Sequence, residues 1–372
     1  MNKLNICYLT YQTFPAETAN SLQSIKNIDK LINNGATVDL IFPKRDINFS
    51  DSVTLIKEYY NIESDFKIII FDHNYPFGKW KHFIKIAFHI SHFLWAKKTV
   101  QQILKTGNKY DFYFTRSEWI YYFLLKRNVK VLLECHQRSK LRDLIIRTNY
   151  KKNNSYIIFL NSILMNKIIK KRNDSNLIVL HNGVDVNEFS ETEEKLNQVI
   201  FVGNLSRFGK DRGIKSIIEG FSNSIFSKSN KFIIIGGPNS KIEEYKKFIK
   251  ENSYSENIEF VGRLNRKETV NLINKSKYGF LANSSDNQHS KFFTSPLKYF
   301  EYLAGNLIIL ATDFESHRSL PYSERITFFK EGDALDITRA IDSLIIESHN
   351  NSIDLEKISL NNRAKSIINF LN

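Results

Sequence analysis

The sequence has 372 residues, of which 42% are hydrophobic and 25% charged; this suits two globular domains and excludes wholesale disorder. Two cysteines, Cys7 and Cys135, exclude a disulfide framework, and no apolar run reaches the roughly 18 residues of a membrane-spanning helix. The net charge of +14 is segregated, with +13 on residues 1–185 and +1 on residues 186–372, which favours an anionic partner for the first half.

The first half alternates short apolar strands with helices. A strand expected over 4–10 leads into a helix with apolar side chains at three- and four-residue spacing from Leu22 to Ile32. Gly35 ends this helix, and a second strand is expected over 37–42. Further apolar runs predict strands over 67–71, 110–115, 130–134, 156–160 and 177–180.

The second half repeats this alternation. Strands are expected over 198–202, 231–235, 258–261, 278–281 and 307–310, and helices over 214–221, 245–250 and 267–274. The apolar pattern is interrupted over 181–196, where Gly183 and an acidic run mark a junction, and an amphipathic helix is expected over 355–371.

This order of elements predicts an α/β protein with two Rossmann-like, doubly wound domains that face each other across a cleft. We expect residues 1–180 to form the first domain, with a C-terminal helix over 355–372 packed back on it, and residues 181–354 to form the second. Doubly wound sheets bind ligands at the carboxyl ends of their strands, so the candidate sites should lie in the turns that follow strands.

One helix of the second half combines the features of a nucleotide site. Ser295 is a favourable N-cap and Pro296 a favourable first helical residue. Lys298 and Glu301 lie three residues apart on one face. A cation in the first turn opposes the helix dipole unless an anion docks on the free N–H groups there. The segment predicts a site for phosphate and ribose, with an ordinary surface ion pair as the alternative.

A second candidate is the turn after the strand at 198–202. Gly203 lets another backbone approach closely, and Arg207, Lys210 and Arg212 supply positive charge just before a helix. Arginine suits bidentate contact with phosphate, while a solvated basic loop is the alternative interpretation.

Taken in order, these segments resemble the donor-binding half of retaining GT-B-fold glycosyltransferases of the large group 1, or family 4, type that synthesises bacterial polysaccharides such as capsule and O-antigen. The turn at 181–185 resembles the Asn-Gly-Val-Asp turn of that family. The elements that resemble its acceptor half are 15–23, 113–117 and 134–136.

The resemblance implies a donor site. Arg212, or alternatively Arg207, would neutralise the donor diphosphate together with Lys298, and Glu301 would bind the ribose. The remaining residues that the resemblance places at the diphosphate are Gly203, Asn204, Ser295, Pro296, Leu297 and Lys298, with the N–H groups of the last two capping a phosphate.

The resemblance also implies an acceptor side. His136 would be the catalytic residue, bound to the transferred sugar or orienting the acceptor, with a structural strand-end histidine as the alternative. Arg116 and Glu134 are the other acceptor-side candidates.

One position departs from the family. Phe293 stands where a first glutamate usually precedes Glu301 by eight residues, so the donor sugar is not predicted. No Asp-x-Asp motif stands out, so we expect fixed Arg and Lys side chains, rather than a metal, to stabilise the leaving diphosphate. The resemblance implies retention of configuration. We expect no metal and no cofactor, because the nucleotide-diphosphate sugar is the donor substrate.

We therefore expect a cytoplasmic glycosyltransferase with a nucleotide-sugar donor and a glycan or lipid-linked polysaccharide precursor as acceptor. The segment 79–98 has basic and aromatic residues at both ends, which predicts peripheral contact with the anionic inner face of the plasma membrane. No nucleic acid is expected, because no RNA- or DNA-binding module is recognisable. The alternatives are a GT-B-fold nucleotide-sugar epimerase and a noncatalytic glycan-binding relative.

Overall fold

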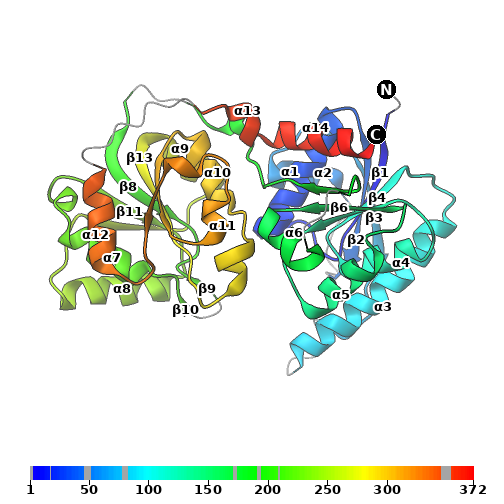
Figure 1. The fold of residues 1–372 in the computed structure, drawn as a ribbon, viewed down its shortest axis with the longest axis horizontal. Helices are drawn as coiled ribbons and strands as arrows, with labels where there is room; N and C mark the ends of the chain where they lie inside the picture. Colours follow the sequence, from blue (N-terminus) through cyan, green and yellow to red (C-terminus); the bar gives the residue numbers. More distant parts are fainter. Residues whose placement is uncertain are drawn as a thin grey trace. The chain divides into compact units, whose positions relative to one another are not determined.

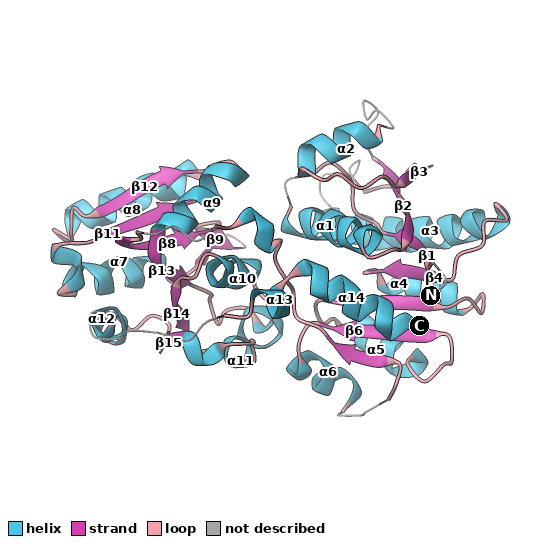
Figure 2. Cartoon of the chain, turned by 90° about the horizontal axis from the view of Figure 1, so that it is seen from above, coloured by secondary structure: helices cyan, strands magenta, loops and turns pink. Residues whose placement is uncertain are grey.

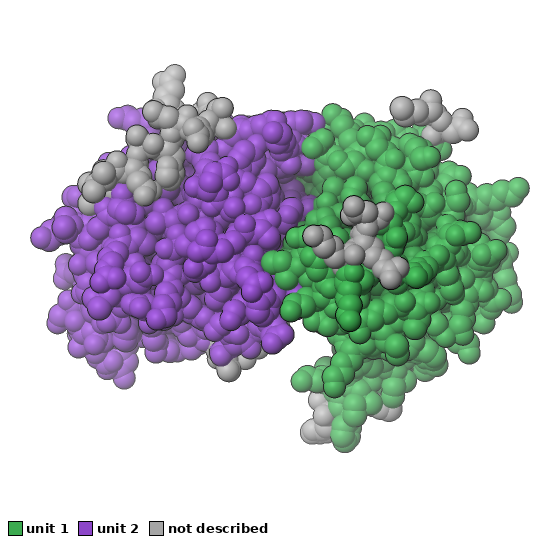
Figure 3. Space-filling model, viewed as in Figure 1, with its two compact units in different colours: residues 1–180, 360–372 green, residues 181–359 purple. Residues whose placement is uncertain are grey.

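The computed structural model describes residues 3–16, 18–45, 52–77, 83–170, 174–190, 194–207, 210–344 and 353–372. The chain divides into two compact units (Figure 3). Unit 1 comprises residues 1–180 and 360–372, and unit 2 comprises residues 181–359.

Unit 1 is built on a seven-stranded sheet in the order β3-β2-β1-β4-β5-β6-β7, with every neighbouring pair parallel. Its strands are β1 (Asn5–Leu9), β2 (Thr37–Lys44), β3 (Lys67–Asp72), β4 (Phe112–Thr115), β5 (Val131–Cys135), β6 (Ser155–Phe159) and β7 (Leu177–Val179). The strand order reverses between β1 and β4, which makes the carboxyl ends of these two strands the switch point of a doubly wound sheet.

Helices cover both faces of this sheet (Figures 1 and 2), which explains why central strands such as β4 and β5 are buried along their whole length. The helices are α1 (Ala19–Asn33), α2 (Val53–Tyr60), α3 (Ile84–Lys105), α4 (Glu118–Leu125), α5 (Lys140–Asn149), α6 (Ser162–Ile169) and the C-terminal α14 (Leu360–Leu371). Helix α14 packs beside α1, and Ala364, Ile367 and Leu371 join the core on that face.

Unit 2 has a six-stranded parallel sheet in the order β12-β11-β8-β13-β14-β15. Its strands are β8 (Leu196–Val202), β11 (Lys231–Ile235), β12 (Ile258–Gly262), β13 (Ser276–Leu281), β14 (Ile308–Thr312) and β15 (Ile326–Phe329). A separate small hairpin pairs β9 (Ser206–Arg207) with β10 (Lys210–Asp211). The order reverses between β8 and β13, which sets the switch point of this unit.

Side chains of β8 alternate between two cores, as the two-residue period of a strand requires. Val199 and Phe201 join the core beneath α7 and α12, whereas Ile200 and Val202 join the core beneath α9 and α10. The helices are α7 (Ile214–Asn223), α8 (Asn239–Glu251), α9 (Arg266–Lys275), α10 (Leu297–Ala304), α11 (Glu315–Arg318), α12 (Ala334–Ser343) and α13 (Leu355–Ile358). Short helical turns are η1 (Val186–Glu188), η2 (Phe226–Lys228), η3 (His289–Phe293) and η4 (Ser323–Arg325).

The predicted α/β class with two doubly wound sheets is confirmed, and each predicted strand is present. The strand β15 was not predicted from the sequence. One continuous helix over 355–371 is wrong: the chain is extended at Ser359, between α13 and α14. Ile358 is buried in the core of unit 2 and its carbonyl accepts the Val184 N–H at 3.0 Å, so α13 belongs to unit 2 and only α14 packs on unit 1.

Candidate functional site

The first group of candidate residues lies at the switch point of unit 2. Gly203 directly follows β8, and its N–H donates to the carbonyl of Ile235 at the end of β11. A Cβ placed on Gly236 would lie 1.8 Å from the Gly203 carbonyl oxygen, so only glycine fits where these two turns meet. The turn at Gly203 is thus held against its neighbour at the carboxyl ends of the strands.

Arg212 joins the two loops that leave this switch point. Its guanidinium donates to the Asn204 carbonyl at 3.2 Å and, after β13, to the Ala282 carbonyl at 2.7 Å and Asn283 Oδ1 at 2.8 Å. Arg212 was assigned to the diphosphate from the sequence. In the structure, these N–H groups donate to oxygen atoms of the protein itself. The side chain of Arg207, the alternative candidate, lies outside the described residues.

A buried histidine that was not singled out from the sequence orients Asn283. His317 Nδ1 lies 2.7 Å from the Thr312 carbonyl, which can only accept, so Nδ1 carries the proton. Nε2 therefore accepts from the Asn283 amide at 3.0 Å, which turns Asn283 Oδ1 toward Arg212. Burial, above all, lowers the pKa of His317 to about 4 and keeps this arrangement neutral.

The helix that was predicted to bind phosphate begins one residue later than expected. Pro296 is the residue before α10 rather than its first helical residue, and no described side chain caps the first turn. Ser295 is not the N-cap, because its Oγ accepts the Asn182 N–H at 2.9 Å and its carbonyl accepts from the Asn182 side-chain amide. The Asn-Gly-Val-Asp turn therefore holds this loop in place, and the first-turn N–H groups at Leu297 and Lys298 remain without a side-chain cap.

Glu301 is held by two cations, one of which was predicted. Its carboxylate accepts from Lys298 Nζ at 2.6 Å and from Arg266 Nη1 at 2.7 Å. Arg266 also donates to Glu188 at 2.7 Å, which ties α9 to η1. Glu301 is only 5% exposed, and burial would raise its pKa, but Lys298 and Arg266 keep that pKa below its usual value. Glu301 is thus an ionised carboxylate beside the start of α10.

Phe293, which stands where a glutamate was expected, is 4% exposed. It ends the helical turn η3, which directly precedes the loop into α10. A buried hydrocarbon therefore takes the place of the carboxylate that the resemblance would supply.

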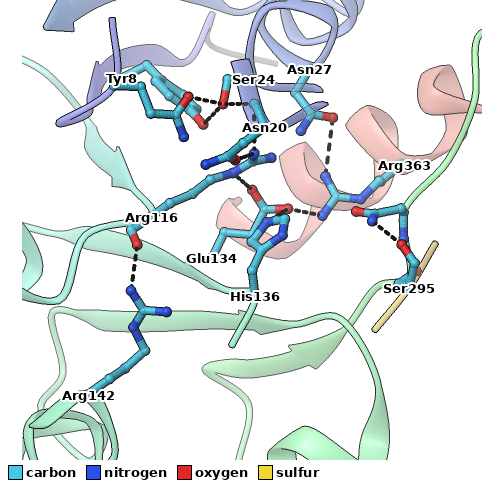
Figure 4. Close-up of polar contacts among 12 residues, drawn as sticks. Tyr8, Asn20, Ser24, Asn27, Arg116, Glu134, His136, Arg142, Ser295 and Arg363 are labelled. Carbon is cyan, nitrogen blue, oxygen red and sulfur yellow. Dashed lines mark hydrogen bonds and ion pairs between the residues drawn. The ribbon is translucent and has the colours of Figure 1, made fainter. Parts of the chain in front are cut away.

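In unit 1 the candidates Arg116, Glu134 and His136 are brought together (Figure 4). Arg116 directly follows β4 and its Nε donates to Glu134 Oε2 at 2.8 Å, while Arg363 of α14 donates to Glu134 Oε1. His136 Nε2 lies 3.2 Å from the same Oε1. Arg116 Nη1 also donates to Asn20 Oδ1 at 2.7 Å, which connects the cluster to α1.

Burial and charge together fix the protonation of this cluster. Burial would raise the pKa of Glu134, but Arg116 and Arg363 bring it well below the usual value. Burial, followed by the nearby Arg116, lowers the pKa of His136 to about 4. Glu134 and Arg116 are turned toward one another rather than toward solvent, and His136, 22% exposed, is the member of the cluster that reaches the surface as a neutral imidazole.

Within the described ranges, membrane-spanning helices and metal-binding groups of side chains are both absent. None of the helices there has the length and apolar character that crossing a membrane requires. Within the same ranges, no three His, Cys, Asp or Glu side chains are grouped so that they could hold a metal ion.

Comparisons with known proteins support the fold, and a known family matches most of unit 2. Residues 185–364 match the family described as glycosyl transferases group 1. No curated protein matches the sequence.

Solved structures with the GT-B fold match nearly the whole chain. Sucrose-phosphate synthase from Thermosynechococcus elongatus is 13% identical, with a TM-score of 0.65 over 99% of this chain and 95% of that one. A glycosyltransferase from Rickettsia africae is 16% identical, with a TM-score of 0.63 over 100% and 95%. Anabaena HepE, solved in complex with UDP and glucose, is 14% identical, with a TM-score of 0.60 over 98% and 94%. The predicted GT-B fold is confirmed.

Proposed function

We propose that this glycosyltransferase, whose residues 185–364 belong to glycosyl transferases group 1, transfers a sugar from a nucleoside-diphosphate sugar to a glycan or a lipid-linked polysaccharide precursor. The observation that carries the proposal is the start of α10, where a loop anchored by Asn182 presents first-turn N–H groups without a side-chain cap beside Lys298. Such a helix end favours a phosphate. Two structural neighbours bind nucleotide or nucleotide-sugar ligands: HepE was solved with UDP and glucose, and an Escherichia coli trehalose-6-phosphate protein with UDP-2-fluoro glucose.

In this proposal the diphosphate is bound by the N–H groups of Leu297 and Lys298 and by the Lys298 ammonium. Lys298 is 31% exposed on its side chain, so its charge is accessible to a ligand although it rests on Glu301. Glu301 keeps its bond to Arg266 and accepts from the ribose hydroxyls with its remaining lone pairs. Arg212 acts indirectly, because it holds the Asn204 loop against Ala282 and Asn283.

The chemistry that we propose is transfer with retention and without a metal ion. Breaking the bond between the sugar and the diphosphate leaves negative charge on the diphosphate, and fixed N–H groups and a lysine at a helix N-terminus stabilise that charge as it develops. The incoming hydroxyl attacks on the face from which the diphosphate departs, as the family resemblance implies, and its proton passes to the departing phosphate oxygen. This route needs no carboxylate as a base.

On the acceptor side we assign His136 to a hydrogen bond with a sugar hydroxyl. Because His136 Nε2 is buried and faces the Glu134 carboxylate, which can only accept, the proton of the neutral imidazole lies on Nε2 and Nδ1 is left to accept from the hydroxyl. The ion pairs of Glu134 leave that carboxylate a positioning role. We further propose that the protein works in the cytoplasm and touches the anionic inner face of the plasma membrane through its basic first half.

A thermal-shift screen against nucleoside diphosphates tests the donor site. One diphosphate should stabilise the protein, and Lys298→Ala and Glu301→Gln should each reduce that stabilisation. Lys246→Ala and Glu243→Gln serve as matched controls, because these residues form an exposed pair of the same spacing at 3.0 Å on α8. An equal ligand-induced shift in the site variants and in the controls would reject the site. Product analysis with the stabilising donor then separates transfer from epimerisation.

A further inference from the structure

A pocket on unit 1 is lined by none of the residues assigned to the proposed reaction. It has a volume of about 640 Å³ and lies between α3 and α4, which pack against each other along the lower edge of the unit in Figure 1. Its walls come from the middle of α3 and from α4 with the residues that follow it.

One part of the pocket is aromatic. Phe93 packs edge-on against Trp119 with ring centroids 4.7 Å apart, and Trp119 stacks over Phe123 at 6.3 Å. All three rings line the pocket together with Tyr122. Aromatic faces of this kind bind hydrocarbon chains and lie readily at a membrane interface.

The other part of the pocket is basic. Lys97, Lys126 and Arg127 line it and are exposed, and no acidic side chain does so. Across the ranges that the structure describes, none of these three cations forms an ion pair with a carboxylate. Lys126 lies 4.5 Å above the Tyr122 ring, which places its ammonium beside the aromatic wall. The pocket therefore combines positive charge, which attracts an anion, with an apolar surface beside it.

An exposed apolar stripe on α3 leads to this pocket. Phe83, Ile86, Ile90 and Leu94 follow one another at three- and four-residue spacing and are 62%, 55%, 40% and 39% exposed. Lys97 continues the same face at the next three-residue step and is itself part of the pocket lining. Large apolar side chains gathered this way are unusual on a surface that faces only water.

From these observations we infer that the pocket binds a single anionic phospholipid of the membrane. The lipid phosphate lies among Lys97, Lys126 and Arg127, an acyl chain lies against Trp119 and Phe93, and the apolar stripe of α3 enters the same leaflet. The inference rests on the membrane contact in the proposed function and adds to it a defined site. A neutral glycan fits less well, because three unpaired cations would find no countercharge in it.

Vesicle co-sedimentation tests this site on the full chain. Binding to phosphatidylcholine vesicles that contain phosphatidylglycerol should exceed binding to pure phosphatidylcholine vesicles. The double variant Lys126→Glu and Arg127→Glu should lower binding to the anionic vesicles about tenfold. Lys151→Glu with Lys152→Glu, an adjacent exposed pair elsewhere on the same unit, makes the same change in charge and should lower binding less than about twofold. Equal losses in the two double variants would overturn the inference, since binding would then follow overall charge.

A second readout reports on the pocket itself. The chain has three tryptophans, so this readout uses a Trp80→Phe background, in which only Trp95 and Trp119 remain. Vesicles of phosphatidylglycerol with brominated acyl chains should quench the tryptophan fluorescence of that background, and adding Trp119→Phe should remove most of the quenching, because Trp95 is buried. Quenching that persists in Trp119→Phe, or equal competition by RNA, would also overturn the inference. The nucleoside-diphosphate thermal shift should be unchanged in all of these variants. A protein that keeps this shift but does not bind vesicles would refute the lipid site and leave the donor site intact.

Discussion

Arg363 and Glu134 form an ion pair that is buried in unit 1, although 229 residues separate them in the chain. Glu134 is the next-to-last residue of β5, two residues before His136, whereas Arg363 lies on the C-terminal helix α14 (Figure 4). The last helix thus supplies one of the two guanidinium groups that keep Glu134 ionised next to the proposed catalytic imidazole. Folding of α14 onto α1 therefore completes the surroundings of His136.

We expect Arg363→Met to destabilise the protein by about 3 kcal/mol, because a buried carboxylate loses one of its partners. Urea unfolding measures this loss. Lys365→Met, at an exposed position of the same helix, is the control and should cost less than about 1 kcal/mol. Similar losses in both variants would show that Arg363 contributes no more than a surface residue.

Stability should fall as the pH decreases from about 6.5 to about 4. His92, His136 and His317 each have a pKa lowered from 6.5 to about 4, with burial as the largest cause. Below pH 6.5 the unfolded chain binds protons at these imidazoles while the folded chain does not, so stability is present above this window and is lost on descending through it. One such histidine accounts for about 3 kcal/mol.

Urea unfolding at a series of pH values checks this window. The decline should be shallower in His317→Asn, which removes one of the three imidazoles. A free energy of unfolding that stays constant down to about pH 4.5 would contradict the assignment of neutral buried histidines.

Arg212→Lys should weaken donor binding about tenfold, because a single ammonium cannot donate hydrogen bonds to all three oxygens that the guanidinium contacts. Calorimetric titration of the nucleoside diphosphate measures the change. Arg318→Lys is the control, because Arg318 makes an exposed two-pronged pair with Asp313 at the edge of the unit. If the two variants bound the donor equally well, Arg212 would have no role in holding the loops.

Replacing Phe293 with the family's usual glutamate should not create a better donor site. The position is buried, so Phe293→Glu should lower the free energy of unfolding by more than about 3 kcal/mol. Phe293→Leu keeps an apolar side chain and should cost about 1 kcal/mol. A stable Phe293→Glu variant with increased activity would show that the carboxylate can be accommodated after all.

Much of the fold was predictable because it depends on local patterns. Buried parallel strands appear as short apolar runs, so β8, β11 and β13 were placed from the sequence. The pair of Lys298 and Glu301 was also foreseeable, because a spacing of three residues puts both on one helix face.

The features that were missed depend on contacts between distant segments. Serine is a favourable N-cap residue, but the hydroxyl of Ser295 accepts a hydrogen bond from the N–H of Asn182, 113 residues away. Arg266 reaches Glu301 across 35 residues, and His317 acts through Asn283, 34 residues away. The break at Ser359 likewise follows from the burial of Ile358 in unit 2 and not from any helix-breaking residue. Local sequence carries no signal for such partners.

The central claim, that the start of α10 binds the diphosphate of a nucleotide, is tested most directly by calorimetry. We predict that the wild-type protein binds a nucleoside diphosphate at least about tenfold more tightly than the matching monophosphate, and that Lys298→Ala abolishes this preference while Lys246→Ala retains it. A preference that survives Lys298→Ala unchanged would contradict the claim.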